Sequence, residues 1–219
     1  MRSVLRLAVG TEVLLLDGAG GHYQCQLIEL AVQGGRAEII RHWRESESAL
    51  PVRLLQGVPK GDRFDLILQK GTELGIAAFT PVWSQRSIPA PAAGRDEKRL
   101  QRWQRIIAEA ARQSRRPLLP ACAAPQPLAS ALAATTEELR LMLWEEGSQP
   151  LATALPAIPP RDVALLVGPE GGFSAAEAQV ATAAGFQPVH LGPRILRSET
   201  AGFAVSAILQ YVYGDFGVR

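Results

Sequence analysis

Two loops carry the residue types with the clearest chemical potential, and each contains a Gly-Pro pair. The first loop is Gly168-Pro169-Glu170-Gly171-Gly172. Its small residues would let backbone N–H and C=O groups approach a flat ligand, with the N-terminus of a helix nearby. The second loop is LGPRILRSET, residues 191–200, and it places Arg194, Arg197 and Glu199 where a strand ends. Catalytic groups usually sit at the carboxyl ends of strands in α/β folds, so the two loops predict a ligand site.

Each loop also has a purely structural explanation. The first has neither the Gly-Lys-Ser/Thr ending of a Walker A loop nor the G-x-G-x-x-G spacing of a dinucleotide loop, and its glycines could simply form the tight entry to a helix. In the second, Ser198 could cap a helix and Glu199 could favour the positive end of that helix. This explanation leaves Pro169, Glu170 and the two arginines of the second loop unexplained, and both interpretations stay open at this point.

The elements that must position the two loops follow a β-α rhythm. A run of apolar residues without alternation, 163–167, predicts a parallel strand buried on both faces. Ser174 begins an S-x-x-E capping box and Gly185 suits a left-handed C-terminal position, so we expect a helix at about 175–184. A second apolar run, 186–191, leads through the second loop into an apolar helix.

The rest of the chain divides into a β region and further β-α elements. Short strand patterns with Gly-rich breaks run from Val4 to Trp43 and predict a small barrel or sheet module. A polar linker at 44–49 follows. Beyond it we expect strands at 50–58, 76–83 and 139–144, and helices at 62–74 and within 95–117. The expected class is therefore α/β with a parallel sheet.

Composition and charge exclude several classes of protein. The chain has 219 residues, of which 47% are hydrophobic. No apolar run approaches the roughly 18 residues of a membrane span, and the N-terminal pattern does not predict a secretory signal. Cys25 and Cys122 lie far apart without a nearby His pair, so we expect no metal site, no disulfide framework and a cytoplasmic location. The net charge is +5 over residues 71–120, where a polyanion could dock, and −4 over residues 121–219.

Four motifs in order resemble those of a known family. They are QKGTELG (69–75), ARQSRRP (111–117), LLVGPEGGFS (165–174) and LGPRILRSETA (191–201). Together they are similar to the RsmE family of SPOUT methyltransferases, from about residue 50 to the C-terminus. The resemblance implies an α/β SPOUT domain over residues 48–219, with a parallel sheet and a deep trefoil knot. It also implies a PUA-like β-barrel over residues 1–47 that lacks its first strand. No periodicity predicts the knot, which departs from the rule that chains are unthreaded.

The same resemblance implies an activity and a cofactor. The family members are homodimeric enzymes that use S-adenosyl-L-methionine to methylate N3 of a uridine in 16S rRNA, so the expected partner is 16S rRNA or the small ribosomal subunit. The family's cofactor positions correspond to three loops of this chain. They are Leu143, Trp144 and Glu145; Gly168, Pro169, Glu170, Gly171 and Gly172; and Leu191, Gly192, Ile195, Leu196 and Arg197. Such a site of backbone groups and leucines suits methyl transfer, which needs alignment and a dry pocket more than a strong acid.

Charged residues of the motifs suggest two further roles. Uracil N3 carries a proton at neutral pH and must lose it before it can attack a methyl group. We expect Arg197 to stabilise negative charge on the uracil carbonyl groups and Glu199 to orient Arg197 or accept the proton. Phosphate contacts are expected from Lys70, Arg86, Arg112, Arg115 and Arg116. Two alternatives stay open: a SPOUT enzyme that methylates a ribose 2′-hydroxyl, and an RNA-binding protein without catalysis.

Overall fold

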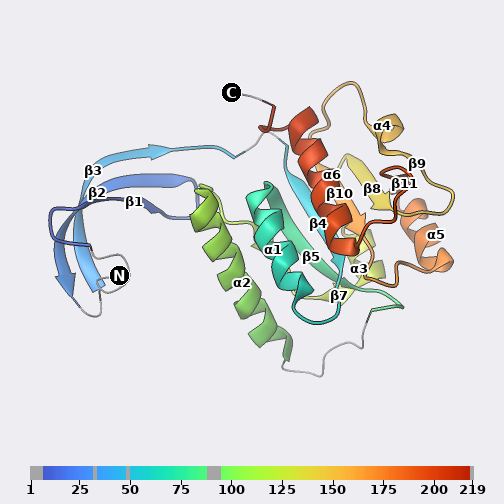
Figure 1. The fold of residues 1–219 in the computed structure, drawn as a ribbon, viewed down its shortest axis with the longest axis horizontal. Coiled ribbons are helices and arrows are strands. Elements are labelled where there is room, and N and C mark those ends of the chain that lie inside the picture. Colours follow the sequence, from blue (N-terminus) through green and yellow to red (C-terminus); the bar gives the residue numbers. More distant parts are fainter. Residues whose placement is uncertain (1–6, 32–33, 48–49, 88–94, 218–219) are drawn as a thin grey trace. The chain divides into compact units, whose positions relative to one another are not determined.

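The computed structural model describes residues 7–31, 34–47, 50–87 and 95–217, and the chain folds into two compact units (Figure 1). One unit comprises Met1–Glu47 together with Ala111–Leu119. The other comprises Ser48–Ala110 and Pro120–Arg219. The first residues of the β region expected from Val4 lie outside the described part of the chain.

The first unit is built on an antiparallel sheet. Its strands β1 (Glu12–Leu16), β2 (Gly21–Ala31) and β3 (Gly34–Arg44) pair in the order β1-β2-β3, as the Gly-rich breaks predict. Asp17 shapes the first turn, because its Oδ1 accepts hydrogen bonds from the backbone N–H groups of Ala19 (2.7 Å) and Gly21 (2.8 Å). These two bonds favour the ionised carboxylate and lower the pKa of Asp17.

Residues 111–119 join this first unit through ionic and backbone contacts. Arg116 donates from Nε and Nη2 to the carboxylate of Glu47, with the Nη2–Oε2 distance at 2.6 Å, and the Arg116 side chain is only 9% exposed. The backbone N–H of Gly20 donates to the carbonyl of Pro117 (2.9 Å), and that of Leu119 donates to the carbonyl of Gly18 (3.0 Å). Residues 111–119 therefore pack with the β region within the first unit.

The second unit is organised around a parallel sheet of eight strands. Its order is β6-β5-β4-β10-β8-β11-β9, and β7 also pairs with β5. The strands are β4 (Val52–Gly57), β5 (Ile76–Trp83), β6 (Ala121–Cys122), β7 (Gln126–Pro127), β8 (Leu139–Leu143), β9 (Gln149–Pro150), β10 (Val163–Val167) and β11 (Gln187–His190). The predicted α/β class is confirmed.

Helices cover both faces of this sheet. They are α1 (Arg63–Glu73), α2 (Arg95–Ser114), α3 (Leu128–Ala133), α4 (Leu151–Ala154), α5 (Ala175–Ala183) and α6 (Ser198–Val212). Buried residues of α1, α2, α4 and α6 form one apolar core with the sheet, and those of α3 and α5 form a second core. Figure 1 shows α1 and α6 side by side over the central strands.

Strand β10 shows why the sequence predicted this arrangement. All five of its residues are buried, with Val163, Leu165 and Val167 in one core and Ala164 and Leu166 in the other. A strand covered on both faces has no need of polar alternation. The predicted strand at 163–167 is therefore confirmed residue for residue.

The helix after β10 also forms as its local signals predict. Ser174 Oγ accepts a hydrogen bond from the N–H of Glu177, and Glu177 Oε2 accepts one from the N–H of Ser174, which is a complete capping box. At the other end Gly185 has φ of +88°, and the N–H of Phe186 donates to the carbonyl of Ala181. Strands β10 and β11 are nevertheless not neighbours, because β8 pairs between them.

No helix in the described part of the chain is long and apolar enough to cross a membrane.

Candidate active site

A cavity of about 950 Å³ lies at the carboxyl ends of β8, β10 and β11. Three loops supply most of its wall: residues 143–146 after β8, 167–173 after β10 and 189–201 after β11. All the residues at 143–145, 168–172 and 191–197 that were predicted to bind the cofactor therefore line one cavity. Arg63 and Arg86 complete it.

The loop after β10 packs closely against the end of β4 and makes a tight turn at Gly172. A Cβ added at Gly57, the last residue of β4, would lie 2.4 Å from Cδ of Pro169. Gly172 has φ of +65°, and its N–H donates to the carbonyl of Pro169 (2.8 Å) in a tight turn. Gly168 and Pro169 are buried, while Glu170 and Gly171 are exposed. All five residues at 168–172, three of them glycines, line the cavity.

Two arginines from other parts of the chain, Arg63 and Arg86, form hydrogen bonds with this loop. Glu170 Oε1 accepts hydrogen bonds from the N–H of Lys60 (3.0 Å) and from Nη1 of Arg63 (2.7 Å), at the start of α1. Arg86 Nη1 donates to the carbonyl of Gly171 (2.7 Å). The Glu170 side chain thus fixes the loop to α1, a function that the sequence pattern did not indicate.

The loop after β11 presents the predicted catalytic pair. Arg197 is exposed and is the N-cap residue of α6, whereas Glu199, in the first turn of α6, is only 8% exposed. Glu199 Oε2 is buried without a hydrogen-bond partner among the described residues. A buried carboxylate oxygen in that state is available to a partner that enters the cavity.

Ser198 does not act as the helix cap that the structural explanation assumed. The cap position belongs to Arg197, and no side chain caps α6 there. Ser198 Oγ instead donates to the carbonyl of Gly168 and accepts from Nε2 of Gln56 (2.9 Å). Gln56 was not among the predicted site residues, because the sequence shows it only as a polar residue at the end of an apolar run.

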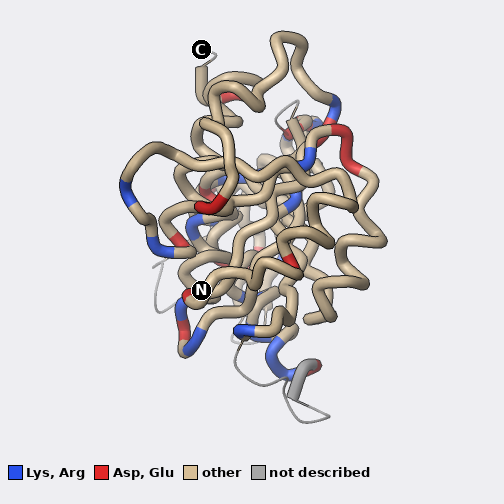
Figure 2. The backbone as a smooth tube through the Cα atoms, turned by 90° about the vertical axis from the view of Figure 1, so that its right-hand side faces the viewer, with Lys and Arg blue, Asp and Glu red and all other residues tan. Residues whose placement is uncertain are grey.

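The five predicted phosphate contacts fall in both units. Lys70 is bonded to Glu73 (2.9 Å), Arg86 holds the Gly171 carbonyl, and Arg116 is largely buried against Glu47. Arg112 and Arg115 are exposed. Figure 2 shows Lys and Arg on several separate segments of the backbone rather than on one continuous run.

The site has neither a metal cluster nor an activated thiol in the described residues. No group of three or more His, Cys, Asp or Glu could hold a metal ion within that part of the chain. Burial raises the pKa of Cys122 to about 12, so this thiol stays protonated at neutral pH.

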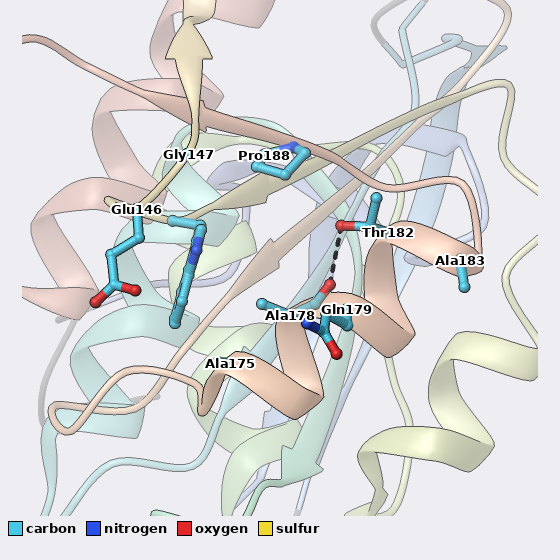
Figure 3. Close-up of a pocket in the computed structure, with 9 residues that line it drawn as sticks. Glu146, Gly147, Ala175, Ala178, Gln179, Thr182, Ala183 and Pro188 are labelled. Atoms are coloured by element: carbon cyan, nitrogen blue, oxygen red, sulfur yellow. Dashed lines mark hydrogen bonds between the residues drawn. The ribbon is translucent and has the colours of Figure 1, made fainter.

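A second, shallower hollow of about 600 Å³ lies beside the first, between α5 and the loop after β8 (Figure 3). Small side chains of α5, including Ala175 and Ala178, form one wall, and Pro188 lies opposite. Trp144 and Glu146 line both cavities. The larger cavity, where the loops and charged residues meet, is the candidate active site.

Comparison with known proteins first defines the class. A family model described as an RNA methyltransferase domain matches residues 46–210. The small-subunit ribosomal RNA methyltransferase E of Synechocystis is 40% identical over 92% of this chain, and the match spans 66% of its own length. That of Bacillus subtilis is 33% identical over 94% of this chain and 84% of its own length. This chain is thus similar to a group of RNA methyltransferases.

Solved structures agree with this. A ribosomal RNA small subunit methyltransferase E from Neisseria gonorrhoeae, bound to S-adenosyl methionine, is 37% identical, with a TM-score of 0.90 over 98% of this chain and 89% of that one. A putative methyltransferase from Legionella pneumophila in complex with the same cofactor is 32% identical, with a TM-score of 0.91 over 98% of this chain and 88% of that one. The chain belongs to the RsmE family of RNA methyltransferases, as its motifs predicted.

Proposed function

We propose that this protein transfers a methyl group from S-adenosylmethionine to N3 of a uridine in 16S rRNA of the small ribosomal subunit. The observation that carries the proposal is a cavity lined by three strand-end loops, with an exposed Arg197 and a buried Glu199 oxygen that has no hydrogen-bond partner among the described residues. Support also comes from relatives named as small-subunit ribosomal RNA methyltransferases and from a similar structure that holds the cofactor.

The cavity fits the cofactor in size and in chemistry. Its volume of about 950 Å³ accommodates a molecule of nucleoside size, within the usual range for ligand sites. Apolar side chains of Leu143, Leu191 and Leu196 would contact the adenosine part, and backbone groups of residues 168–172 would supply hydrogen bonds. The cofactor supplies an electrophilic methyl group. The protein's task is then to align the uridine and to keep water out.

Arg197 and Glu199 would make uracil N3 nucleophilic. A guanidinium near the uracil carbonyl groups lowers the free energy of the deprotonated base, because the negative charge spreads onto those oxygens. Glu199 either orients the guanidinium or accepts the proton, and its buried Oε2 has no competing partner among the described residues. Arg197 and Glu199 flank Ser198, whose hydroxyl group is hydrogen-bonded to Gln56 and to the Gly168 carbonyl.

The product identifies the reaction. The protein is incubated with S-adenosylmethionine and either free 16S rRNA or intact small subunits that lack the modification, and the nucleosides are then analysed by mass spectrometry. We expect 3-methyluridine. A 2′-O-methylated nucleoside would establish the ribose-methylating alternative, and the absence of methyl transfer from both substrates would establish an RNA-binding protein without catalysis.

Arg115 is the phosphate contact that the structure supports best. It is exposed and is the one non-glycine residue of the described chain with positive φ, at +57°. The position closes α2, where the N–H of Arg116 donates to the carbonyl of Ala111 and glycine is the usual residue. An arginine there costs about 1 kcal/mol in backbone strain, and a contact with RNA would offset that cost.

Two substitutions of Arg115 distinguish the effect of its backbone strain on stability from the effect of its positive charge on RNA binding. Arg115→Gly should raise the free energy of unfolding by about 1 kcal/mol, because the strain is relieved. It should also reduce the slope of log affinity for RNA against log salt concentration by about 1. Arg115→Ala is the matched control, since it removes the charge and keeps a Cβ at positive φ. It should show the smaller salt slope without the gain in stability. A wild-type salt slope in both variants would reject the phosphate contact.

The finer features of the fold are also proposals. We propose that residues 48–219 form a SPOUT domain with a deep trefoil knot and that residues 1–47 form a PUA-like module. The route of the chain supports the knot: β11 lies beyond β8, whereas α6 packs on β10 and α1 and is bonded through Ser198 to the loop after β10. The antiparallel sheet β1-β2-β3 is compatible with a small barrel.

We also propose a homodimer that works in the cytoplasm. Helix α6 has an exposed apolar face, with Ile208 36%, Tyr211 70% and Val212 48% exposed at helical spacing. A second copy of the chain would cover this face. Sedimentation velocity at several concentrations would reveal a monomer if the face serves another purpose.

A further inference from the structure

Gln56 is a polar side chain at a position where the fold otherwise places apolar ones. It precedes the last residue of β4 and is 0% exposed, next to the fully buried Leu54 and Leu55. A buried amide destabilises a fold unless it makes hydrogen bonds, so its partners should explain its presence.

Two of those partners belong to loops of the candidate active site. Gln56 Nε2 lies 3.2 Å from the carbonyl oxygen of Gly168 and 2.9 Å from Ser198 Oγ, and it also lies 3.1 Å from the carbonyl of Gly57. Ser198 Oγ in turn donates to the Gly168 carbonyl. The amide orientation follows from chemistry, because the alternative would place Oε1 against two carbonyl oxygens. One side chain thus joins β4, the loop after β10 and the start of α6.

This arrangement is not the most stable choice for the position. Gln56 Oε1 is buried without a partner among the described residues, which costs roughly 1–3 kcal/mol. An apolar side chain of similar length would avoid that cost. The hydrogen bonds therefore have a use other than stability, and Ser198, the residue they hold, stands between Arg197 and Glu199.

We propose that Gln56 is a positioning residue for methyl transfer. Its amide fixes Ser198 against Gly168, so that Arg197 and Glu199 keep a set position relative to the cofactor loop. This inference rests on the proposed function. It assigns Gln56 no contact with the cofactor or the uridine, since Gln56 does not line the cavity.

The test replaces the amide with an unbranched apolar side chain of the same length. Gln56→Met should fold with a Tm equal to or above that of the wild type, because it removes the unpartnered oxygen. Its affinity for S-adenosylmethionine, measured by calorimetry, should change by less than about threefold. The single-turnover rate of methyl transfer at saturating cofactor should fall about tenfold, because small misplacements of catalytic groups have large effects on rate. A wild-type rate would overturn the proposal.

Further variants separate positioning from a general structural role. If Gln56 acts through Arg197, the variant Gln56→Met/Arg197→Ala should be no slower than Arg197→Ala alone, and additive losses would contradict the proposal. Ser206→Ala is the matched control, because Ser206 is on α6 like Ser198 and, like Gln56, is 0% exposed with a buried oxygen that has no partner in the described chain. It should keep the wild-type rate. Ser198→Ala, which removes the other half of the contact, should also slow transfer and serves if Gln56→Met does not fold.

Hydrogen exchange gives a measurement that does not depend on the reaction. In the protein without substrate, Gln56→Met should speed amide exchange at the start of α6, and Ser206→Ala should not. Unchanged exchange there would overturn the positioning role even if the protein proved to have another activity. Faster exchange in a protein that makes no 3-methyluridine would instead count against the proposed function alone.

Discussion

Arg197→Ala should slow methyl transfer about 10²- to 10³-fold, the largest effect that we expect from any single side chain. That range is typical for removal of one donor that stabilises developing negative charge. Arg197 is exposed at the N-terminus of α6, where its guanidinium can reach a base entering the cavity. The rate is measured in single turnovers at saturating S-adenosylmethionine, because Arg197 also lines the cofactor cavity.

Two companion variants define the cause of that loss. Arg197→Lys keeps the positive charge and loses the planar pair of donors, so it should lie between the wild type and Arg197→Ala. Arg161→Ala removes an arginine whose side chain is 75% exposed and pairs only with the neighbouring Asp162 in the described contacts. It should leave the rate unchanged. If Arg197→Ala transfers methyl groups at the wild-type rate while it still binds the cofactor, Arg197 has no catalytic role.

Local patterns were sufficient for the elements that hold the site. Strand β10 and helix α5 were predicted closely because their signals lie within the segments themselves: an unbroken apolar run, a Ser174–Glu177 box and a glycine at position 185. The two loops were recognised for the same reason. Their glycines and arginines stand directly after strands, and parallel strands bring their carboxyl ends to one edge of the sheet.

Contacts between distant parts of the chain were beyond such patterns. Gln56 and Ser198 are separated by 142 positions, and Arg63 and Glu170 by 107. No periodicity connects them, and the order β10-β8-β11 cannot be inferred from two consecutive β-α units. The ion pairs of Arg116 with Glu47 and of Arg102 with Asp62 and Asp65 were equally beyond such patterns, because these partners meet only after the chain has folded.

Gly57→Ala should weaken the binding of S-adenosylmethionine about tenfold to a hundredfold. The added Cβ would lie 2.4 Å from Cδ and 2.5 Å from N of Pro169, whereas carbon atoms in contact are normally about 3.5–4.0 Å apart. The obstacle is backbone and a proline ring, so the loop after β10 must shift. Overpacking of this kind costs about 1–3 kcal/mol, and here it would displace the backbone groups that face the cofactor. Calorimetric titration of the cofactor measures the change.

Gly202→Ala is the control variant. It tests whether the loss of cofactor affinity in Gly57→Ala comes from the close contact with Pro169. A Cβ at Gly202 would lie 3.8 Å from Gln56 Oε1 and 3.8 Å from Cγ2 of Val167, which are ordinary contacts. Because Gly202 is inside α6, the alanine should stabilise the protein by up to about 1 kcal/mol and leave cofactor affinity unchanged. The two substitutions add the same methyl group within one region of the second unit, so a difference between them reports on the loop. Equal cofactor affinity in both variants would show that the Gly57 contact does not position the loop.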